Sequence, residues 1–230
     1  RVLARLTERG TATLTITVTS EGTLLCSHQR ELDLLPYNHW PGLSVPAELL
    51  AVFIQPNEPS LMTLQRAVAD ILQEFSESPS LEGYQAANPA RVRKMLFAVY
   101  GAIQRLDITY TNPPASFEQD GQKIRLVPSV LGARMGTCLD LTVLAAASLE
   151  QAGLHPLVML VEGHAFVGVW LGETHFPEPT VGSAQRILQR MDLGEIAVVD
   201  ITGATTRPGG QFDDATDEAR RYLEASDDFF

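Results

Sequence analysis

One apolar helix-forming segment, followed by two apolar strand-forming runs, constrains the fold of this chain more than any other feature. Thr137 is a suitable N-cap for a helix that begins at Cys138, and Gly153 is a typical terminating residue. Residues 156–161 and 164–171 are short apolar runs of the length expected for buried strands. Because such a helix must bury its apolar surface against the strands, the sequence predicts an α+β domain.

Three side chains of complementary chemistry fall on these elements. Cys138 lies in the first turn of the helix, where the helix dipole and the unpaired backbone N–H groups favour a thiolate and can face a developing oxyanion. His164 begins the second strand, and Asp200 lies near the end of a third strand predicted over 195–202. A thiol, an imidazole and a carboxylate can act as nucleophile, general base and orienting acceptor.

Each of these residues also has a purely structural interpretation. Cys138 can be a small buried hydrophobe, as most free cysteines are, and His164 can be a satisfied histidine at a strand end. Asp200 can be a turn residue that caps Gly203, in which case Glu195 is the remaining carboxylate. The order and placement of the three residues favour the catalytic interpretation.

Four short motifs carry a family resemblance that extends over about residues 125–203. They are Met-Gly-Thr-Cys at 135–138, Ala-Gly at 152–153, His-Ala-Phe at 164–166 and Asp-Ile-Thr at 200–202. In this order they resemble the transglutaminase-like superfamily, which has the papain-like cysteine protease fold. The resemblance implies a Cys-bearing core helix packed on an antiparallel sheet.

The resemblance also implies cysteine-dependent acyl transfer on a peptide or carboxamide bond, with Cys138, His164 and Asp200 as the catalytic residues. Hydrolysis by a peptidase or amidase is the first expectation, because no dedicated amine site is apparent. The alternatives are a protein-crosslinking transglutaminase, a non-catalytic protein-binding module and a structural assembly domain. The expected substrate is a protein or a peptide.

The second oxyanion donor is not obvious from the sequence. Papain has a glutamine six residues before its nucleophile, but Gly132 occupies that position here. Gln122 and Tyr110, both in the preceding loop, are candidates for this role. Trp170 falls on the same face of its strand as His164 by period two and is a candidate to line the cleft, with core packing as the alternative.

Upstream segments carry a narrower resemblance, at 34–42, 83–85 and 112–124. They are similar to the transglutaminase-like segment that precedes large bacterial helicase-related ATPases. This resemblance implies that the chain belongs to a longer polypeptide with C-terminal ATPase or helicase domains, which a binding module could regulate. It also suggests a role in defence against phage.

The remaining sequence predicts two domains. Residues 11–18 alternate threonine with apolar residues, and the turn at Glu21-Gly22 follows, so residues 1–46 are expected to form a β-rich extension. Residues 47–230 are expected to form the transglutaminase-like domain. Its further helices are predicted at 47–54, 60–75, 88–106, 128–134 and 183–191, and a solvated acidic helix at 213–228 is expected to lead into a further domain.

Composition limits the possible ligands and partners. A net charge of −11 disfavours direct nucleic-acid binding, and no run is apolar enough to predict a membrane span. Two cysteines are too few for a disulfide framework, which favours a cytoplasmic setting. No ligand spacing predicts a metal, and no cofactor is expected.

Overall fold

The structure is a computed structural model that describes residues 3–76 and 78–226. It contains two compact units, Arg1–His39 and Trp40–Phe230, which are described separately. The division therefore falls after His39, whereas the sequence placed it near residue 46. Within the described ranges, no helix combines the length and the apolar character that crossing a bilayer requires.

The smaller unit is a long β-hairpin that follows a 3₁₀ turn, η1 (Leu3–Arg5). Strand β1 (Gly10–Ser20) pairs antiparallel with β2 (Thr23–Leu34), and nearly all of their side chains are exposed. Glu21 and Gly22 both have positive φ, at 49° and 80°, as a tight two-residue hairpin turn requires. The strand and the turn predicted in this region are confirmed.

The larger unit contains helices near all the positions that the sequence predicts. In chain order the helices are η2 (Gly42–Ser44), η3 (Ala47–Phe53), α1 (Leu61–Ser76), α2 (Pro89–Arg105), α3 (Phe117–Asp120), α4 (Val127–Ala133), α5 (Cys138–Gln151), α6 (Ala184–Asp192), η4 (Ile201–Thr205) and α7 (Phe212–Ala225). The strands are β3 (His39–Trp40), β4 (Thr109–Tyr110), β5 (Gln122–Lys123), β6 (Met135–Gly136), β7 (Pro156–Val161), β8 (His164–Trp170) and β9 (Ile196–Val199).

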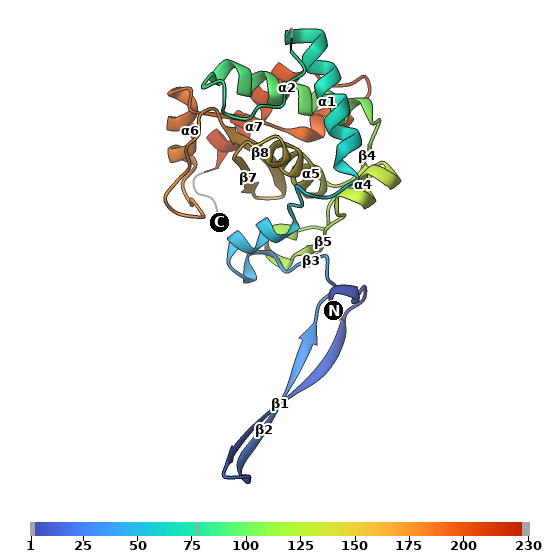
Figure 1. Cartoon of the computed structure of the whole chain (residues 1–230), viewed down its shortest axis with the longest axis vertical. Helices are drawn as coiled ribbons and strands as arrows, with labels where there is room; N and C mark the ends of the chain where they lie inside the picture. The colour runs from blue at the N-terminus through green and yellow to red at the C-terminus, as the bar shows by residue number, and fades with distance from the viewer. Residues whose placement is uncertain (1–2, 77, 227–230) are drawn as a thin grey trace. The chain divides into compact units, whose positions relative to one another are not determined.

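The central sheet is antiparallel and has the order β7-β8-β9. A two-residue turn joins β7 to β8, so Val161 pairs with His164, and further along β8 Val167 pairs with Val199. Helix α5 packs against β7 and β8, and Figure 1 shows it at the centre of the larger unit with α1 and α2 above it. The α+β class predicted from the sequence is confirmed.

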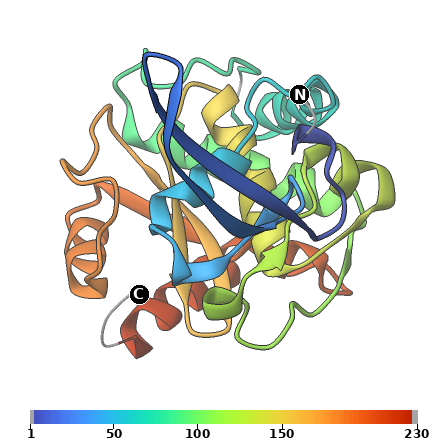
Figure 2. The same ribbon diagram turned by 90° about the horizontal axis from the view of Figure 1, so that it is seen from below.

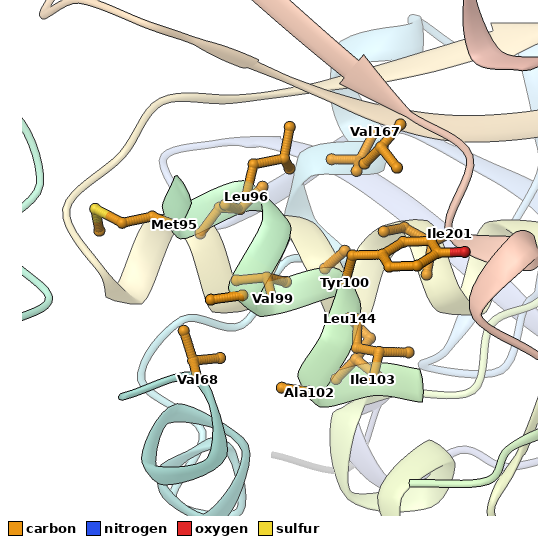
Figure 3. Close-up of a cluster of buried hydrophobic side chains, with 14 of the residues drawn as sticks. Val68, Met95, Leu96, Val99, Tyr100, Ala102, Ile103, Leu144, Val167 and Ile201 are labelled. Atoms are coloured by element: carbon orange, nitrogen blue, oxygen red, sulfur yellow. The ribbon is translucent and has the colours of Figure 1, made fainter. Parts of the chain in front are cut away.

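Helices α1 and α2 cover the face of α5 that does not meet the sheet. Figure 3 shows the resulting core, in which Leu96 and Val99 from α2 lie with Leu144 from α5, Val167 from β8 and Ile201 from η4. All of these side chains are almost completely buried. Apolar residues spaced by three and four along each helix produce this packing.

Helix α7 differs from its sequence prediction. Ala215, Ala219 and Leu223 are buried on one face, which packs against β9 and α6 (Figure 2). The expectation of a solvated helix is therefore wrong for this face, because an acidic sequence with alanine and leucine at helical spacing still buries an apolar stripe. The end of the predicted segment, 227–228, lies outside the described residues.

Candidate active site

The start of α5 is fixed by a capping box. The Asp140 backbone N–H donates to the Thr137 hydroxyl at 3.3 Å, and the Asp140 carboxylate accepts from the Thr137 N–H at 2.9 Å. The same carboxylate accepts from the backbone N–H of Arg125 at 2.7 Å and from its guanidinium at 3.0 Å. Asp140 is fully buried. One carboxylate therefore joins the preceding loop to the helix and fixes Cys138 as the first helical residue.

A short parallel strand pair brings Tyr110 to the same helix end. Tyr110 pairs with Gly136, and the Thr111 N–H donates to the Gly136 carbonyl at 2.9 Å. Burial raises the pKa of the Tyr110 hydroxyl, and the charge of Cys138 and a hydrogen bond with it raise this pKa further. Tyr110 is thus a neutral phenol beside the sulfur near neutral pH.

His164 and Asp200 are joined by a hydrogen bond of 3.1 Å between Nε2 and Oδ2. Asp200 follows β9 directly, and its Oδ1 accepts from the Thr202 N–H at 2.9 Å and from the Thr202 hydroxyl at 2.8 Å. Both oxygens of this buried carboxylate are therefore held in place. Because Nε2 of the ring faces Asp200, Nδ1 is the nitrogen available to Cys138.

The surroundings of His164 favour the charged imidazolium. Burial by itself lowers the pKa of the ring, but hydrogen bonds with Asp200 and Cys138, together with the negative charges of both groups, raise it to about 9. A positive imidazolium between a carboxylate and a sulfur is the arrangement in which a thiolate gains most stabilisation.

All three predicted residues are buried. Cys138 is 0% exposed, Asp200 is 4% exposed and His164 is 9% exposed. Tyr222 from α7 covers the imidazole, with ring centroids 4.5 Å apart and ring planes tilted by 31°. The structure therefore brings the three side chains into one enclosed site that also includes two tyrosines.

Comparisons with known proteins leave the family open. No protein-family model and no curated protein matches the chain. A solved structure of a "putative protease" from Parabacteroides distasonis is similar, at 12% identity and a TM-score of 0.36. The match covers 85% of this chain and 41% of that protein, so this chain spans less than half of its length.

Trp170 does not reach the site. It shares a face of β8 with His164 but lies six residues further along, which separates the two by about 20 Å at the rise of a strand. Its ring packs edge-on against Phe176, with centroids 4.8 Å apart, in a separate apolar cluster. Trp170 therefore does not line the surroundings of the sulfur, because period two fixes the face of a strand but not the distance along it. It does line a groove along β7, at the opposite end of β8 from His164.

Gln122 lies in β5 and is buried. It is 4% exposed, and its Nε2 has no hydrogen-bond partner within the described part of the chain. Ile124, two residues later, belongs to the hydrophobic cluster that contains Cys138. Of the two oxyanion candidates, only Tyr110 has a pKa that Cys138 raises.

Sequence reasoning missed the role of Tyr222 beside His164. The residue lies in an acidic segment that shows no motif, and its contact depends on α7 folding back onto β9. The apolar spacing of Ala215, Ala219 and Leu223 was the available signal, since it predicts a buried face on this helix. That spacing could have indicated packing on the sheet but not the ring contact itself.

Proposed function

We propose that the chain is a transglutaminase-like cysteine hydrolase, a peptidase or amidase of papain-like fold, in which Cys138, His164 and Asp200 form the catalytic triad. The observation that carries the proposal is the position of His164. Its ring is hydrogen-bonded to the Asp200 carboxylate, and the interaction with Cys138, which begins a helix, helps to raise its pKa. This arrangement supplies the nucleophile, the proton carrier and the orienting group that acyl transfer requires.

In the proposed reaction, the Cys138 thiolate attacks the carbonyl carbon of a peptide or carboxamide and forms a tetrahedral intermediate. The imidazolium of His164 then donates its proton to the leaving nitrogen, which departs as an amine or ammonia, and a thioester remains. Neutral His164 next removes a proton from water, which attacks the thioester and releases the carboxylic acid. Asp200 stabilises the imidazolium in both steps.

Two donors are proposed for the oxyanion. The first is the backbone N–H of Cys138, which lies at the N-terminus of α5 and is one of the amides without an intrahelical partner. The second is the Tyr110 hydroxyl, which is supported by the effect of Cys138 on its pKa and by the pairing of Tyr110 with Gly136, two residues before Cys138. Gln122, with its unpartnered buried amide, is the alternative donor.

The complete burial of Cys138 favours a second candidate function. A thiol without solvent exposure is also expected in a non-catalytic protein-binding module that regulates an attached helicase-like ATPase. In such a module the polar triad would only hold the core together, and the reactivity of the sulfur would not depend on the imidazole.

Thiol reactivity separates the two candidates. Cys26 lies on the exposed hairpin, so a Cys26→Ser chain leaves Cys138 as the one thiol to be alkylated by iodoacetamide at pH 7. An activated thiol is expected to lose at least about tenfold in alkylation rate on His164→Ala, because the imidazolium no longer stabilises the thiolate. His28→Ala, a change of an exposed hairpin histidine, is the matched control and should leave the rate unchanged.

Equal and slow alkylation in the parent, the His164→Ala chain and the His28→Ala chain would reject the hydrolase and favour the binding module. Hydrolysis and transfer are then separated by incubating a glutamine-containing peptide with and without a primary amine. Formation of an amide with the added amine would identify a transglutaminase instead of a hydrolase.

A further inference from the structure

Strand β7 is an edge strand of the central sheet, because the sheet has the order β7-β8-β9. An edge strand presents every second pair of its backbone groups outward, where they can pair with another chain. In this sheet the turn that follows β7 leads directly to His164. One end of the outer edge of β7 therefore lies beside the proposed catalytic site.

The register identifies the outward backbone groups. The Trp170 N–H donates to the His155 carbonyl at 3.2 Å, so this opposing pair is a hydrogen-bonded one. Hydrogen-bonded pairs recur at every second residue, which assigns Leu157, Met159 and Val161 to bonds with β8. The N–H and C=O groups of Val158 and Leu160 then face outward. Within the described residues, neither of these two forms a backbone hydrogen bond beyond the β7–β8 pair.

A groove of about 360 Å³ runs along this edge. One wall is formed by Leu50 and Ala51 of η3 and by Ile54, which follows it, and the other is the loop that contains Phe176 and residues 178–181. Val158 and Leu160 are part of the groove lining. The walls are mainly apolar, with Glu48 on one side and Glu178 on the other. Such walls on both sides of free backbone donors and acceptors suit an extended chain with alternating side chains.

We propose that this groove binds an extended polypeptide segment as an added strand on β7 and delivers it to Cys138. Leu160 lines the groove, and Val161 next to it pairs with His164, so the groove runs along β7 toward the proposed catalytic site. The inference rests on the proposed hydrolase function and narrows its substrate to polypeptides bound through their main chain. Free amino-acid amides, which have no such main chain, would not use the groove.

The test uses a Cys138→Ala chain, which binds without turnover, and fluorescein-labelled dephosphorylated β-casein as an unstructured polypeptide. Binding is followed by fluorescence anisotropy. On addition of unlabelled casein, amide exchange measured by NMR is expected to slow at least about tenfold at Val158 and Leu160, because their N–H groups become paired. The Met159 amide, already bonded to β8, is the internal control and should change little.

Two substitutions test the groove independently. Val158→Pro removes one outward N–H, which an edge strand tolerates, and should raise the Kd for casein at least about tenfold. Val158→Ala keeps that N–H and is the matched control. Ala51→Trp fills the exposed η3 wall and should weaken binding similarly, whereas Ala51→Ser should not. Thermal unfolding confirms that each chain is folded.

Three results would overturn the inference. The first is that casein does not bind, and the second is that it binds without slowing exchange at Val158 and Leu160. The third is that those amides are protected without casein because two copies pair through β7. Sedimentation velocity detects the last case. Failure of the hydrolase itself appears separately, as alkylation of Cys138 that does not depend on His164. If casein binds at β7 but the alkylation of Cys138 does not depend on His164, the result would support a peptide-binding site and reject the proposed hydrolase.

Discussion

The ring of Tyr222 lies 4.5 Å from the ring of His164, centroid to centroid, and the two planes are tilted by 31°. Tyr222 belongs to α7 and His164 to β8, so the contact joins the end of the described chain to the centre of the sheet. Burial raises the pKa of Tyr222, and the nearby charge of Asp200 raises it further. The ring is therefore a neutral cover over the imidazole near neutral pH.

Removing this cover should expose the sulfur. Tyr222→Ala is expected to raise the alkylation rate of Cys138 by iodoacetamide about tenfold in the Cys26→Ser background, because access limits the reaction of a buried thiol. Tyr222→Phe keeps the ring and is the matched control, with an expected rate near that of the parent. An unchanged rate in Tyr222→Ala would mean that another element closes the site.

Thr202 donates two hydrogen bonds to the carboxylate of Asp200, the orienting group of the proposed triad. Thr202→Val removes the hydroxyl that donates to Asp200 at 2.8 Å and keeps the shape of the side chain. The expected result is a roughly tenfold loss in the His164-dependent alkylation rate, since partners that orient such groups contribute about 10- to 100-fold. Thr202→Ser restores the donor and should restore the rate. A parent-like rate in Thr202→Val would show that the backbone N–H alone holds the carboxylate.

The raised pKa of His164 predicts a specific dependence of stability on pH. The folded-state pKa of about 9 exceeds the ordinary value of 6.5, so the proton on His164 stabilises the fold fully below pH 6.5. This stabilisation is lost as pH rises through 9. The parent should be more stable than His164→Gln at low pH. This difference in the free energy of unfolding should decrease as the pH rises from 6.5 through 9, by roughly 3 kcal/mol at most. Urea unfolding at several pH values measures the difference, and a flat difference would contradict the assignment.

Asp140 should contribute strongly to stability. Asp140→Ala removes a fully buried acceptor of bonds from Thr137 and Arg125, and it leaves buried donors unsatisfied. The expected loss is about 2–4 kcal/mol in the free energy of unfolding. Glu150→Gln, an exposed change on the same helix, should have an effect below about 0.5 kcal/mol. A loss for Asp140→Ala as small as that of the control would argue against the capping network.

Local sequence patterns predicted the helices and strands of the larger unit well, because the caps, turns and apolar spacing that produce each element lie within its own segment. The cap at Thr137 and the apolar run after Cys138 predicted α5. The helix predicted at 88–106 is α2, where the Asn88 side chain accepts from the Ala90 N–H and Pro89 is the first helical residue. The two-residue turn before His164 follows equally from its sequence. Each of these features depends on hydrogen bonds or packing within a few residues.

Features that depend on long-range packing were not predictable in the same way. The position of Tyr222 follows from α7 lying on β9, and the distance of Trp170 from His164 follows from strand length. The burial of Cys138 depends on residues from several distant segments, among them Trp40 and Phe117. A single sequence indicates which faces of its helices and strands are apolar, but not which of these faces pack against one another.

The bonds made by Asp140 have a consequence for every experiment on the thiol. They anchor the beginning of α5 through Thr137 and Arg125, without any contribution from the imidazole or from α7. The sulfur should accordingly keep its location when His164 or Tyr222 is replaced. Altered reactivity in those variants would then report a change in chemistry or access at an undisturbed atom, rather than a collapse of its surroundings.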